Sequence, residues 1–532
     1  MKDLYLKLAL KQIPRILTLV DTDMTSPTYG CFDREYWHYR TADFPCGMSQ
    51  EFVLPLALVY KTEFRDNPFF GNEKIKEIIL AGIRFAEKSS HRDGSCDDYF
   101  PYERAYGAAS FSLYAFTESY LLLDIKDDSI ETFLKRRGNW LASNVESGKL
   151  SNHHAIAALA LYELWEITGV HKYKHIAGEK IDLCLSWQST EGWFQEYEGC
   201  DPGYLSMTID FLARYYKKVK NEDLLKALKK AVEFLDYFVY PDGTCGGEIG
   251  SRDTYIFMPH GFELLGSVCE KSLEIKERYL SCLKEGKDTN FEDSRIFGHM
   301  TYSHLMAWLD YNDKDITVRG RPDIEKDFTN SCLYAAKKRN YYFVCSYSKG
   351  GVFKLFKNDK LLFTDTGIVC ELDSGKVCVT NRIDTENSFQ GQVRGDVIGI
   401  EKELFYYKRQ LATPAKQALL RIILFFLGWL PAFSRFIRKL LQRILIIGKD
   451  KAPVSFNRTL HLGEDGLEIR DKISLLGNEN VKRMYVSTDK VSIYIAMSEC
   501  FNTGALKPWI DLNPYLDKLN SERVVEITRK LK

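Results

Sequence analysis

Residues 151–169 read SNHHAIAALALYELWEITG, and this stretch decides the class of the fold. Its apolar side chains fall at i, i+3, i+4, i+8 and i+11, and they are Ile156, Leu159, Ala160, Leu164 and Ile167. That spacing predicts a helix over 152–168 with one buried face. Asn152 is a suitable N-cap, and Gly169 stands where such a helix would end.

The same helical spacing recurs on both sides of this stretch. It predicts helices over 3–19, 48–62, 73–89, 105–124, 129–145, 152–168, 171–188, 204–219, 222–238, 256–269, 271–285 and 297–311. Helices of this length joined by short turns can close into an α/α toroid, in which the loops of the inner helices line a mouth. An open solenoid is the alternative, but the sequence has no fixed repeat period.

The pattern changes to that of strands after Arg-Gly-Arg-Pro at 319–322. Short β-branched and aromatic runs, separated by glycine, asparagine and aspartate turns, are typical of antiparallel hairpins. The predicted strands are 341–345, 351–356, 367–372, 376–380, 392–408, 453–462, 466–475, 482–488 and 491–497. We therefore predict a multidomain α+β protein with an α/α toroid over 1–318 and an antiparallel β-sandwich over 328–532.

One basic segment, 413–449, interrupts the predicted sandwich. It has seven Lys and Arg side chains and no acidic one, and Pro431 divides it into two helices. The apolar stripe of the second helix consists of Phe433, Phe436, Ile437, Leu440, Leu441, Ile444 and Leu445. The first helix is too short, and too charged at Arg421, for a membrane span of roughly 20 apolar residues. The pattern predicts a helical hairpin on an anionic membrane surface, with packing on protein as the alternative.

Composition excludes several classes of protein. The 532 residues include 73 basic and 73 acidic side chains, so the formal charge is zero and the chain lacks the signature of a nucleic-acid-binding protein. The 13 cysteines are scattered without a metal-binding pattern, and charges at positions 3, 7 and 11 interrupt the N-terminal apolar run. These features predict reduced thiols, no cofactor and no metal. They also predict a cytoplasmic protein, peripheral on the inner face of the cell membrane.

Three loop motifs resemble those of the heparinase II/III-like proteins. They are Asn-His opening a helix at 152–153, Gly-Trp-Phe-x-Glu-Tyr followed by Asp-Pro-Gly-Tyr over 192–204, and Gly-Gly-Glu-x-Gly-Ser-Arg over 246–252. The resemblance extends over residues 30–530 apart from 413–449. It implies a toroid followed by a β-sheet domain, and the activity of a polysaccharide lyase that cleaves a uronic-acid-containing glycan by β-elimination.

The resemblance also implies residue roles. Asn152 would neutralise the substrate carboxylate, Tyr204 and either His153 or His154 would transfer protons, and Arg252 would stabilise negative charge. A further histidine from a later segment is His260, His299 or His304. The candidate substrate-binding residues are Tyr102, Glu103, Arg104, Trp193, Glu196, Tyr197, Glu248 and His260. The implied partner is an acidic polysaccharide or a lipid-linked glycan in biosynthesis or processing.

Structural interpretations and other functions stay open at this point. Trp193 suits a core as well as a sugar-stacking platform, and Arg252 can pair with Asp253. A uronate C5-epimerase shares the first proton abstraction with a lyase. An inverting glycoside hydrolase would need two carboxylates from among Asp98, Glu103, Glu196, Asp201 and Glu248. A non-catalytic glycan-binding protein is the alternative from a different class.

Overall fold

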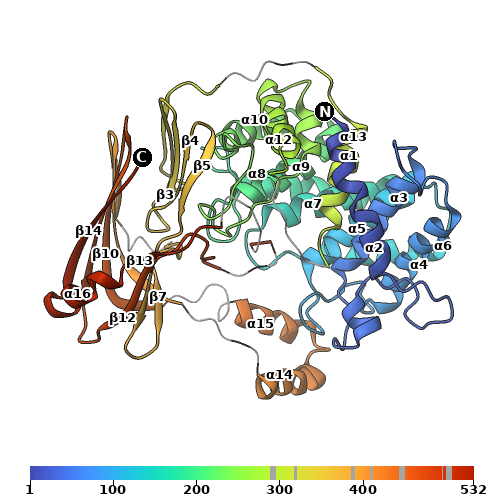
Figure 1. The fold of residues 1–532 in the computed structure, drawn as a ribbon. Coiled ribbons are helices and arrows are strands. Elements are labelled where there is room, and N and C mark those ends of the chain that lie inside the picture. The colour runs from blue at the N-terminus through green and yellow to red at the C-terminus, as the bar shows by residue number, and fades with distance from the viewer. Residues whose placement is uncertain are drawn as a thin grey trace.

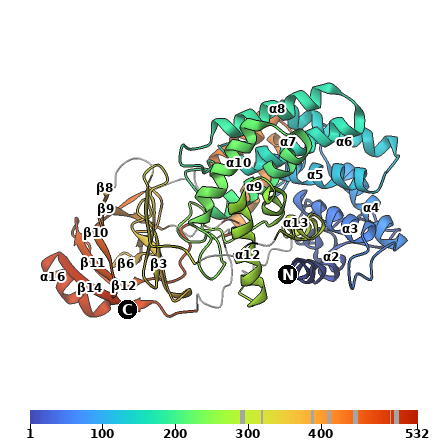
Figure 2. The same ribbon diagram turned by 90° about the horizontal axis from the view of Figure 1, so that it is seen from above.

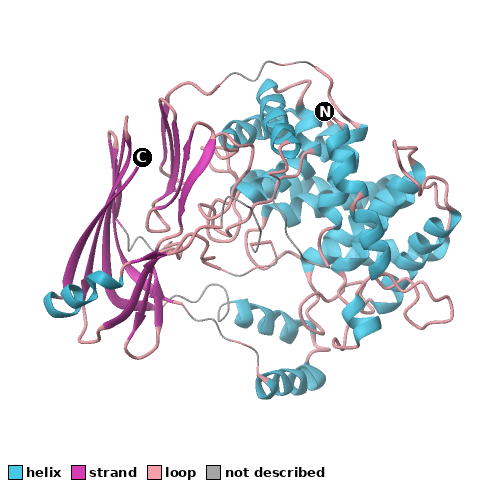
Figure 3. Ribbon diagram, viewed as in Figure 1, coloured by secondary structure: helices cyan, strands magenta, loops and turns pink. Residues whose placement is uncertain are grey.

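The computed structural model consists of a helical part and a β part that lie side by side (Figure 1). It describes residues 1–532 apart from 288–294, 315, 317–319, 385–389, 408–410, 412, 443–449, 494, 496 and 499–505. Helices and strands are segregated between the two parts, except for three helices from the later half of the chain (Figure 3). The predicted fold class, a toroid followed by antiparallel sheets with a helical insertion, is confirmed.

The helices of the first part follow the predicted ranges closely. They are α1 (Asp3–Leu10), α2 (Gln12–Leu19), α3 (Val53–Lys61), α4 (Glu73–Ser89), α5 (Tyr106–Leu122), α6 (Asp128–Ser143), α7 (Ser151–Thr168), α8 (His171–Ser186), α9 (Pro202–Val219), α10 (Glu222–Asp236), α11 (His260–Leu265), α12 (Glu270–Lys284) and α13 (Gly298–Leu309). Two predictions are wrong in length, because 3–19 divides at Lys11 and 256–269 shortens to α11.

The inner helices form a closed ring within the described residues. α3, α5, α7, α9, α11 and α13 contact one another in that order, and α13 contacts α3 again. Each inner helix also contacts the outer helix next to it in the chain or, for α13, α1, in the pairs α3/α4, α5/α6, α7/α8, α9/α10, α11/α12 and α13/α1, and α6 contacts α7 as well (Figure 2). Because the ring closes on itself, the helical part is a toroid and the open solenoid is excluded.

Aromatic side chains fill the axis of this toroid. Phe111 on α5 contacts three rings from other inner helices, those of His153, Phe211 and His299, at centroid distances of 5.2–5.9 Å. One turn further along α5, Tyr114 makes a similar contact with Tyr302. We call the end of the toroid at which α5, α7, α9 and α13 begin the mouth. Because aromatic side chains fill the axis, we expect a substrate to bind at the mouth.

The β part consists of two antiparallel sheets. The smaller has the order β1-β2-β3-β4-β5, and the larger has the order β13-β12-β6-β7-β9-β10-β11-β14, with β8 paired to β9. The strands are β1 (Ile324–Phe328), β2 (Leu333–Lys338), β3 (Tyr341–Ser346), β4 (Val352–Lys357), β5 (Lys360–Asp365), β6 (Ile368–Leu372), β7 (Val377–Val379), β8 (Gln390–Arg394), β9 (Val397–Tyr406), β10 (Lys451–Gly463), β11 (Gly466–Leu475), β12 (Val481–Val486), β13 (Ile510–Asp511) and β14 (Val524–Leu531).

The smaller sheet lies between the toroid and the larger sheet (Figure 1). In β2, Leu333 and Ala335 belong to the core shared with the helices, whereas Tyr334 and Ala336 face the larger sheet. Burial on both faces explains why the strands of this sheet read as nearly continuous apolar runs. The helix α16 (Leu516–Glu522) packs on the larger sheet and completes its core.

The strand predictions are wrong at two places. The segment 392–408 is not one strand, because β8 and β9 form a hairpin with a turn at Gly395, where φ is 54°. The segment 491–497 has no strand among its described residues. Five strands are not in the prediction, namely β1, β2, β5, β13 and β14. Exposed charged residues dilute the apolar pattern of β1, β5 and β14, and long-range pairing stabilises all five strands.

The basic insertion forms a helical hairpin that packs on the toroid. Its helices are α14 (Pro414–Leu427) and α15 (Pro431–Gln442), and they lie between β9 and β10 in the chain. Leu424 and Ile437 form a small core with Phe100, and the Ser434 hydroxyl donates to the carbonyl of Tyr102. Ile444 and Leu445 of the predicted stripe lie outside the described residues. Within those residues, every helix is too short or too polar to cross a bilayer.

Candidate functional site

The loops at the mouth hold several residues in an unfavourable backbone conformation. Tyr102, Arg104, Tyr197 and Asp253 have φ values between 53° and 63°. Residues that carry a Cβ rarely adopt this left-handed region, so the surrounding contacts must impose it. Such conformations gather at functional sites, and these four residues all come from loops that precede inner helices.

Asn152 lies in the first turn of α7 and is held by a buried carboxylate. Its backbone N–H and its Nδ2 donate to the two oxygens of Glu196, both at 2.9 Å. The N-cap of α7 is Leu150, so the capping role predicted for Asn152 is wrong. Burial raises the pKa of Glu196 to about 8. The Asn152 amide is fixed in orientation, and its Oδ1 has no hydrogen-bond partner among the described residues.

The loop that carries Arg252 contacts Glu196, and the Arg252 guanidinium group is buried. This group is 4.0 Å from the ring centre of Tyr197, and the neighbouring Ser251 hydroxyl donates to the carbonyl of Glu196 at 3.3 Å. Arg252 is 0 % exposed, and its three side-chain nitrogens have no hydrogen-bond partner among the described residues. A buried cation without a partner is costly, so this group is suited to bind an anion.

The Asp201 carboxylate holds the backbones of Tyr204 and Arg252 close together. Asp201 caps α9 by accepting the backbone N–H of Tyr204 at 3.1 Å, and its other oxygen accepts the backbone N–H of Arg252 at 2.8 Å. Burial raises the pKa of Tyr204, so its phenol is protonated at neutral pH. Burial likewise raises the pKa of Tyr197 to about 12.

These contacts bring together five predicted residues, Asn152, Glu196, Tyr197, Tyr204 and Arg252, which we call the mouth cluster. They come from α7, the α8–α9 loop, α9 and the α10–α11 loop. Tyr197 and Tyr204 are half-buried, so the cluster meets solvent.

His153 extends the mouth cluster along α7. Its Nδ1 is 2.8 Å from Glu146 Oε2, and Arg438 of α15 lies 2.9 Å from Glu146 Oε1. Burial alone raises the pKa of Glu146, but the charges of Arg438 and His153 outweigh burial and lower it to about 2. An ionised Glu146 favours the imidazole tautomer with hydrogen on Nδ1, which leaves the Nε2 lone pair available.

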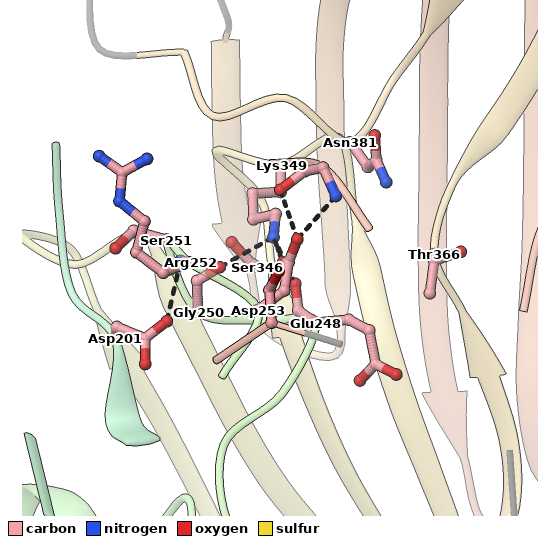
Figure 4. Close-up of polar contacts among 12 residues, drawn as sticks. Asp201, Glu248, Gly250, Ser251, Arg252, Asp253, Ser346, Lys349, Thr366 and Asn381 are labelled. Carbon is pink, nitrogen blue, oxygen red and sulfur yellow. Dashed lines mark hydrogen bonds and ion pairs between the residues drawn. The ribbon is translucent and has the colours of Figure 1, made fainter. Parts of the chain in front are cut away.

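The β part anchors the loop that carries Arg252. Lys349, which follows β3, reaches the carbonyls of Glu248 and Gly250 at 2.6 and 2.8 Å and pairs with Asp253 (Figure 4). Glu248 is not at the mouth cluster, because its carboxylate pairs with Lys354 of β4 at 2.7 Å. Figure 4 shows the Arg252 guanidinium pointing away from this lysine, so the predicted Arg252–Asp253 pair does not form.

Three neighbouring predicted residues, Tyr102, Glu103 and Arg104, hold their own loop together. The backbone N–H groups of Tyr102 and Arg104 donate to Asp97 at 2.8 and 3.0 Å. The Arg104 guanidinium pairs with Asp93, so it is not free to bind a substrate anion. Glu103 accepts two backbone N–H groups of the same loop, and burial raises its pKa to about 7.

Three other predicted residues lie away from the mouth cluster. His154 packs between a tryptophan and a tyrosine, and burial lowers its pKa to about 3. Trp193 is 7 % exposed and belongs to the core, so its ring offers no platform for a sugar. His260 hydrogen-bonds through Nε2 to Asp310, which follows the C-terminal end of α13, opposite the mouth. Helical periodicity alone does not distinguish these orientations.

Sequence reasoning missed the partners that complete the site. Glu146 and Arg438 stand in no motif, and Arg438 lies outside the apolar stripe of α15, so periodicity predicts no buried contact for it. Among the later histidines, His304 is engaged by Tyr279. His299 is different, because Glu51 lies 3.0 Å from its Nδ1 while its Nε2 has no partner among the described residues. Within those residues, no cluster of three His, Cys, Asp or Glu side chains could hold a metal.

Several solved structures of polysaccharide lyases are similar to this chain in fold. The chain is similar to a chondroitin AC lyase of Streptomyces coelicolor A3 bound to chondroitin sulphate, with a TM-score of 0.57 and 9 % identity over 91 % of this chain and 68 % of that one. It is also similar to a Paenibacillus xanthan lyase, with a TM-score of 0.56 and 11 % identity, and to heparinase III, with a TM-score of 0.50 and 10 % identity.

The similarity lies in the structure and not in the sequence. The two latter matches each cover 91 % of this chain, but only 46 % of the xanthan lyase chain and 76 % of the heparinase III chain. The chain thus spans less than half the length of the xanthan lyase. No family model and no curated protein sequence matches this chain. The comparison establishes the fold, and the activity has to be argued from the mouth cluster.

Proposed function

We propose that this protein is a heparinase II/III-like polysaccharide lyase that cleaves a uronic-acid-containing glycan by β-elimination. The observation that carries the proposal is the buried Arg252 guanidinium, which has no hydrogen-bond partner among the described residues. It lies over the ring of Tyr197, the residue that follows Glu196, and Glu196 orients the amide of Asn152. A uronate carboxylate supplies the missing anion. The amide and the guanidinium together stabilise the negative charge that develops on that carboxylate when the C5 proton leaves.

The remaining chemistry is a proton transfer at each end of the broken bond. His153 Nε2 accepts the C5 proton, the C4–C5 double bond forms, and the bond from C4 to the glycosidic oxygen breaks. The protonated phenol of Tyr204 donates its proton to that leaving oxygen. The two side chains then exchange protons with solvent, so the residues return to their resting states and one unsaturated uronate is formed.

Arg438 and Glu146 act as positioning residues for His153. Glu146 stays ionised because Arg438 compensates its burial, and the ionised carboxylate orients the imidazole. The hairpin therefore belongs to the proposed site, although it is an insertion in the sandwich. His299 is a further candidate for proton transfer. It lies near the axis of the toroid, where Phe111 contacts both the His299 ring and the His153 ring.

The test is product analysis with site variants on a panel of uronate polymers that includes chondroitin sulphate. We expect the wild-type protein to release ultraviolet-absorbing unsaturated ends, and Arg252→Met and Tyr204→Phe to abolish the signal. Tyr216→Phe, in the same helix as Tyr204, is the matched control and should retain it. Failure of the wild-type protein on every uronate polymer, with glycan binding intact, would favour the non-catalytic alternative.

The epimerase alternative gives a distinct outcome of the same experiment. Solvent deuterium would enter C5 without new chain ends. The hydrolase alternative has less support, because the carboxylates that it needs are engaged in structural bonds. Glu196 binds Asn152, Asp201 caps α9 and Glu248 pairs with Lys354. If the protein is a hydrolase, Glu196→Gln and Glu248→Gln should abolish turnover, whereas Tyr204→Phe should stay active. A lyase should give the opposite result.

A further inference from the structure

The helical hairpin has one face that the toroid covers and another that nothing in the described chain covers. On the covered face, Leu424, Ser434 and Ile437 are buried and Arg438 reaches the site. On the other face, Phe425, Phe426 and Trp429 are 73, 65 and 62 % exposed. Other large apolar side chains on the open face are Leu419, Ile422, Phe436 and Leu440.

Such a patch has no role in the packing of the protein on itself. An exposed aromatic and aliphatic cluster of this kind is typical of a surface that binds a membrane or another protein. The helix pattern explains why the face is open. Leu424 of α14 and the C-cap residue Gly428 are buried at an i, i+4 spacing. Phe425 and Phe426 lie about 100° and 200° further around the helix than Leu424, so their side chains face outward.

The charge of the open face favours a lipid surface over a second copy of the chain as its binding partner. Lys416, Arg435 and Lys439 are exposed around the apolar side chains, and 413–449 has no acidic residue. A second copy of the chain would place this basic face against its own like charge, whereas an anionic lipid surface is complementary to it. Exposed Trp429 is also the type of side chain that prefers the boundary between water and hydrocarbon.

A cavity lies next to the exposed apolar side chains of α14. Its volume is about 640 Å³, and it lies between α14 and the loops near Asp43 and Tyr102. Ile422, Phe425 and Phe426 line this cavity and also belong to the exposed face. The apolar surface of the patch therefore continues between the hairpin and the toroid.

We infer that the outer face of α14 and α15 docks on an anionic phospholipid surface and seats the mouth of the toroid next to the membrane. That the glycan presented there is attached to lipid rests on the proposed function. The docking itself does not, because lipid binding is measured without any glycan.

The experiment is sedimentation of the full chain with phosphatidylcholine vesicles, with and without phosphatidylglycerol, at low and high salt. We expect binding to the vesicles that contain phosphatidylglycerol only, weakened by salt. Arg435→Glu together with Lys439→Glu should weaken binding by about 30-fold or more, since two attractive charges are reversed. Phe425→Ser together with Phe426→Ser should abolish binding at high salt, where only apolar contact remains.

Two control variants distinguish binding through the hairpin from nonspecific binding to vesicles. Lys472→Glu with Lys518→Glu reverses two exposed charges in the β part, and Leu476→Ser removes an exposed apolar side chain there. Both should bind vesicles like the wild type. The proposal is overturned if the wild type does not sediment with anionic vesicles, if the controls lose as much binding, or if the hairpin variants convert a dimer into a monomer. Activity on a soluble glycan, measured in parallel, reports on the proposed function separately.

Discussion

Two fully buried arginines in this protein have opposite surroundings. Arg458, between the two sheets, binds Asp471 through two nitrogens at 2.6 and 3.0 Å and Asp365 through a third at 3.1 Å. Arg252, at the mouth of the toroid, has no hydrogen-bond partner for its guanidinium in the described chain. A buried cation with all its partners is part of the framework, whereas one without them is available for an anionic ligand. The comparison therefore separates a structural charge from a functional one.

Removing the paired arginine should give the largest effect, on stability. Arg458→Met leaves Arg529 as the one remaining ion-pair partner, among the described residues, of two buried carboxylates, Asp365 and Asp471. We expect the free energy of unfolding to fall by about 3–5 kcal/mol, measured by denaturant titration. Arg470→Met, which removes an exposed arginine of the neighbouring strand, is the control and should change it by less than about 0.5 kcal/mol. Equal losses in the two variants would remove the distinction.

Removing the unpaired arginine should affect activity and leave stability nearly unchanged. Arg252→Met abolishes the proposed stabilisation of the developing carboxylate charge, so we expect kcat to fall by about 10²–10³-fold. The free energy of unfolding should not decrease, because no ion pair is lost. Steady-state kinetics and denaturant titration of the same preparation test both statements. A large loss of stability with unchanged kcat would assign Arg252 to the framework.

Arg438 lies between the two cases, because it is paired but acts on His153 through Glu146. In Arg438→Met the pKa of Glu146 should rise from about 2, since burial is no longer compensated. We expect kcat to fall by about 10-fold or more and the acidic limb of the pH–rate profile to move to higher pH. Arg435→Met, one turn away on the exposed face, should leave the profile unchanged.

The last prediction concerns the pH dependence of stability at Glu196. Its pKa is about 8 in the folded protein and ordinary, near 4.5, in the unfolded chain, so the folded state holds the extra proton between these values. Stability from this group is fully present below about pH 4.5 and is lost as the pH rises through 8, by up to about 1.4 kcal/mol per pH unit. Glu196→Gln removes this dependence. The free energy of unfolding of the wild type, minus that of Glu196→Gln, should therefore decrease as the pH rises from 5 to 8. Denaturant titration of both proteins at several pH values measures this difference.

Local pattern predicted most of the fold. The stretch 151–169 contains the stripe, the first turn and the terminating Gly169 of α7, and the structure bears out each of these except the cap. The three loop motifs that resemble those of the heparinase II/III-like proteins implied Asn152, Tyr204 and Arg252 as candidate residues. Where prediction failed, the missing information was orientation. Trp193 and His154 lie in motifs of the right type, yet their side chains turn into the core.

The sequence by itself determined the elements of this protein, because periodicity and turn residues act over a few positions. It also determined that a basic, acid-free hairpin would interrupt the sandwich. Only the tertiary structure decided that α13 closes on α3, that the β part anchors the loop of Arg252 through Lys349, and that Arg438 turns inward to Glu146. These contacts join residues far apart in the chain. Their free energy depends on burial and on the partner that each charge meets, which no local pattern records.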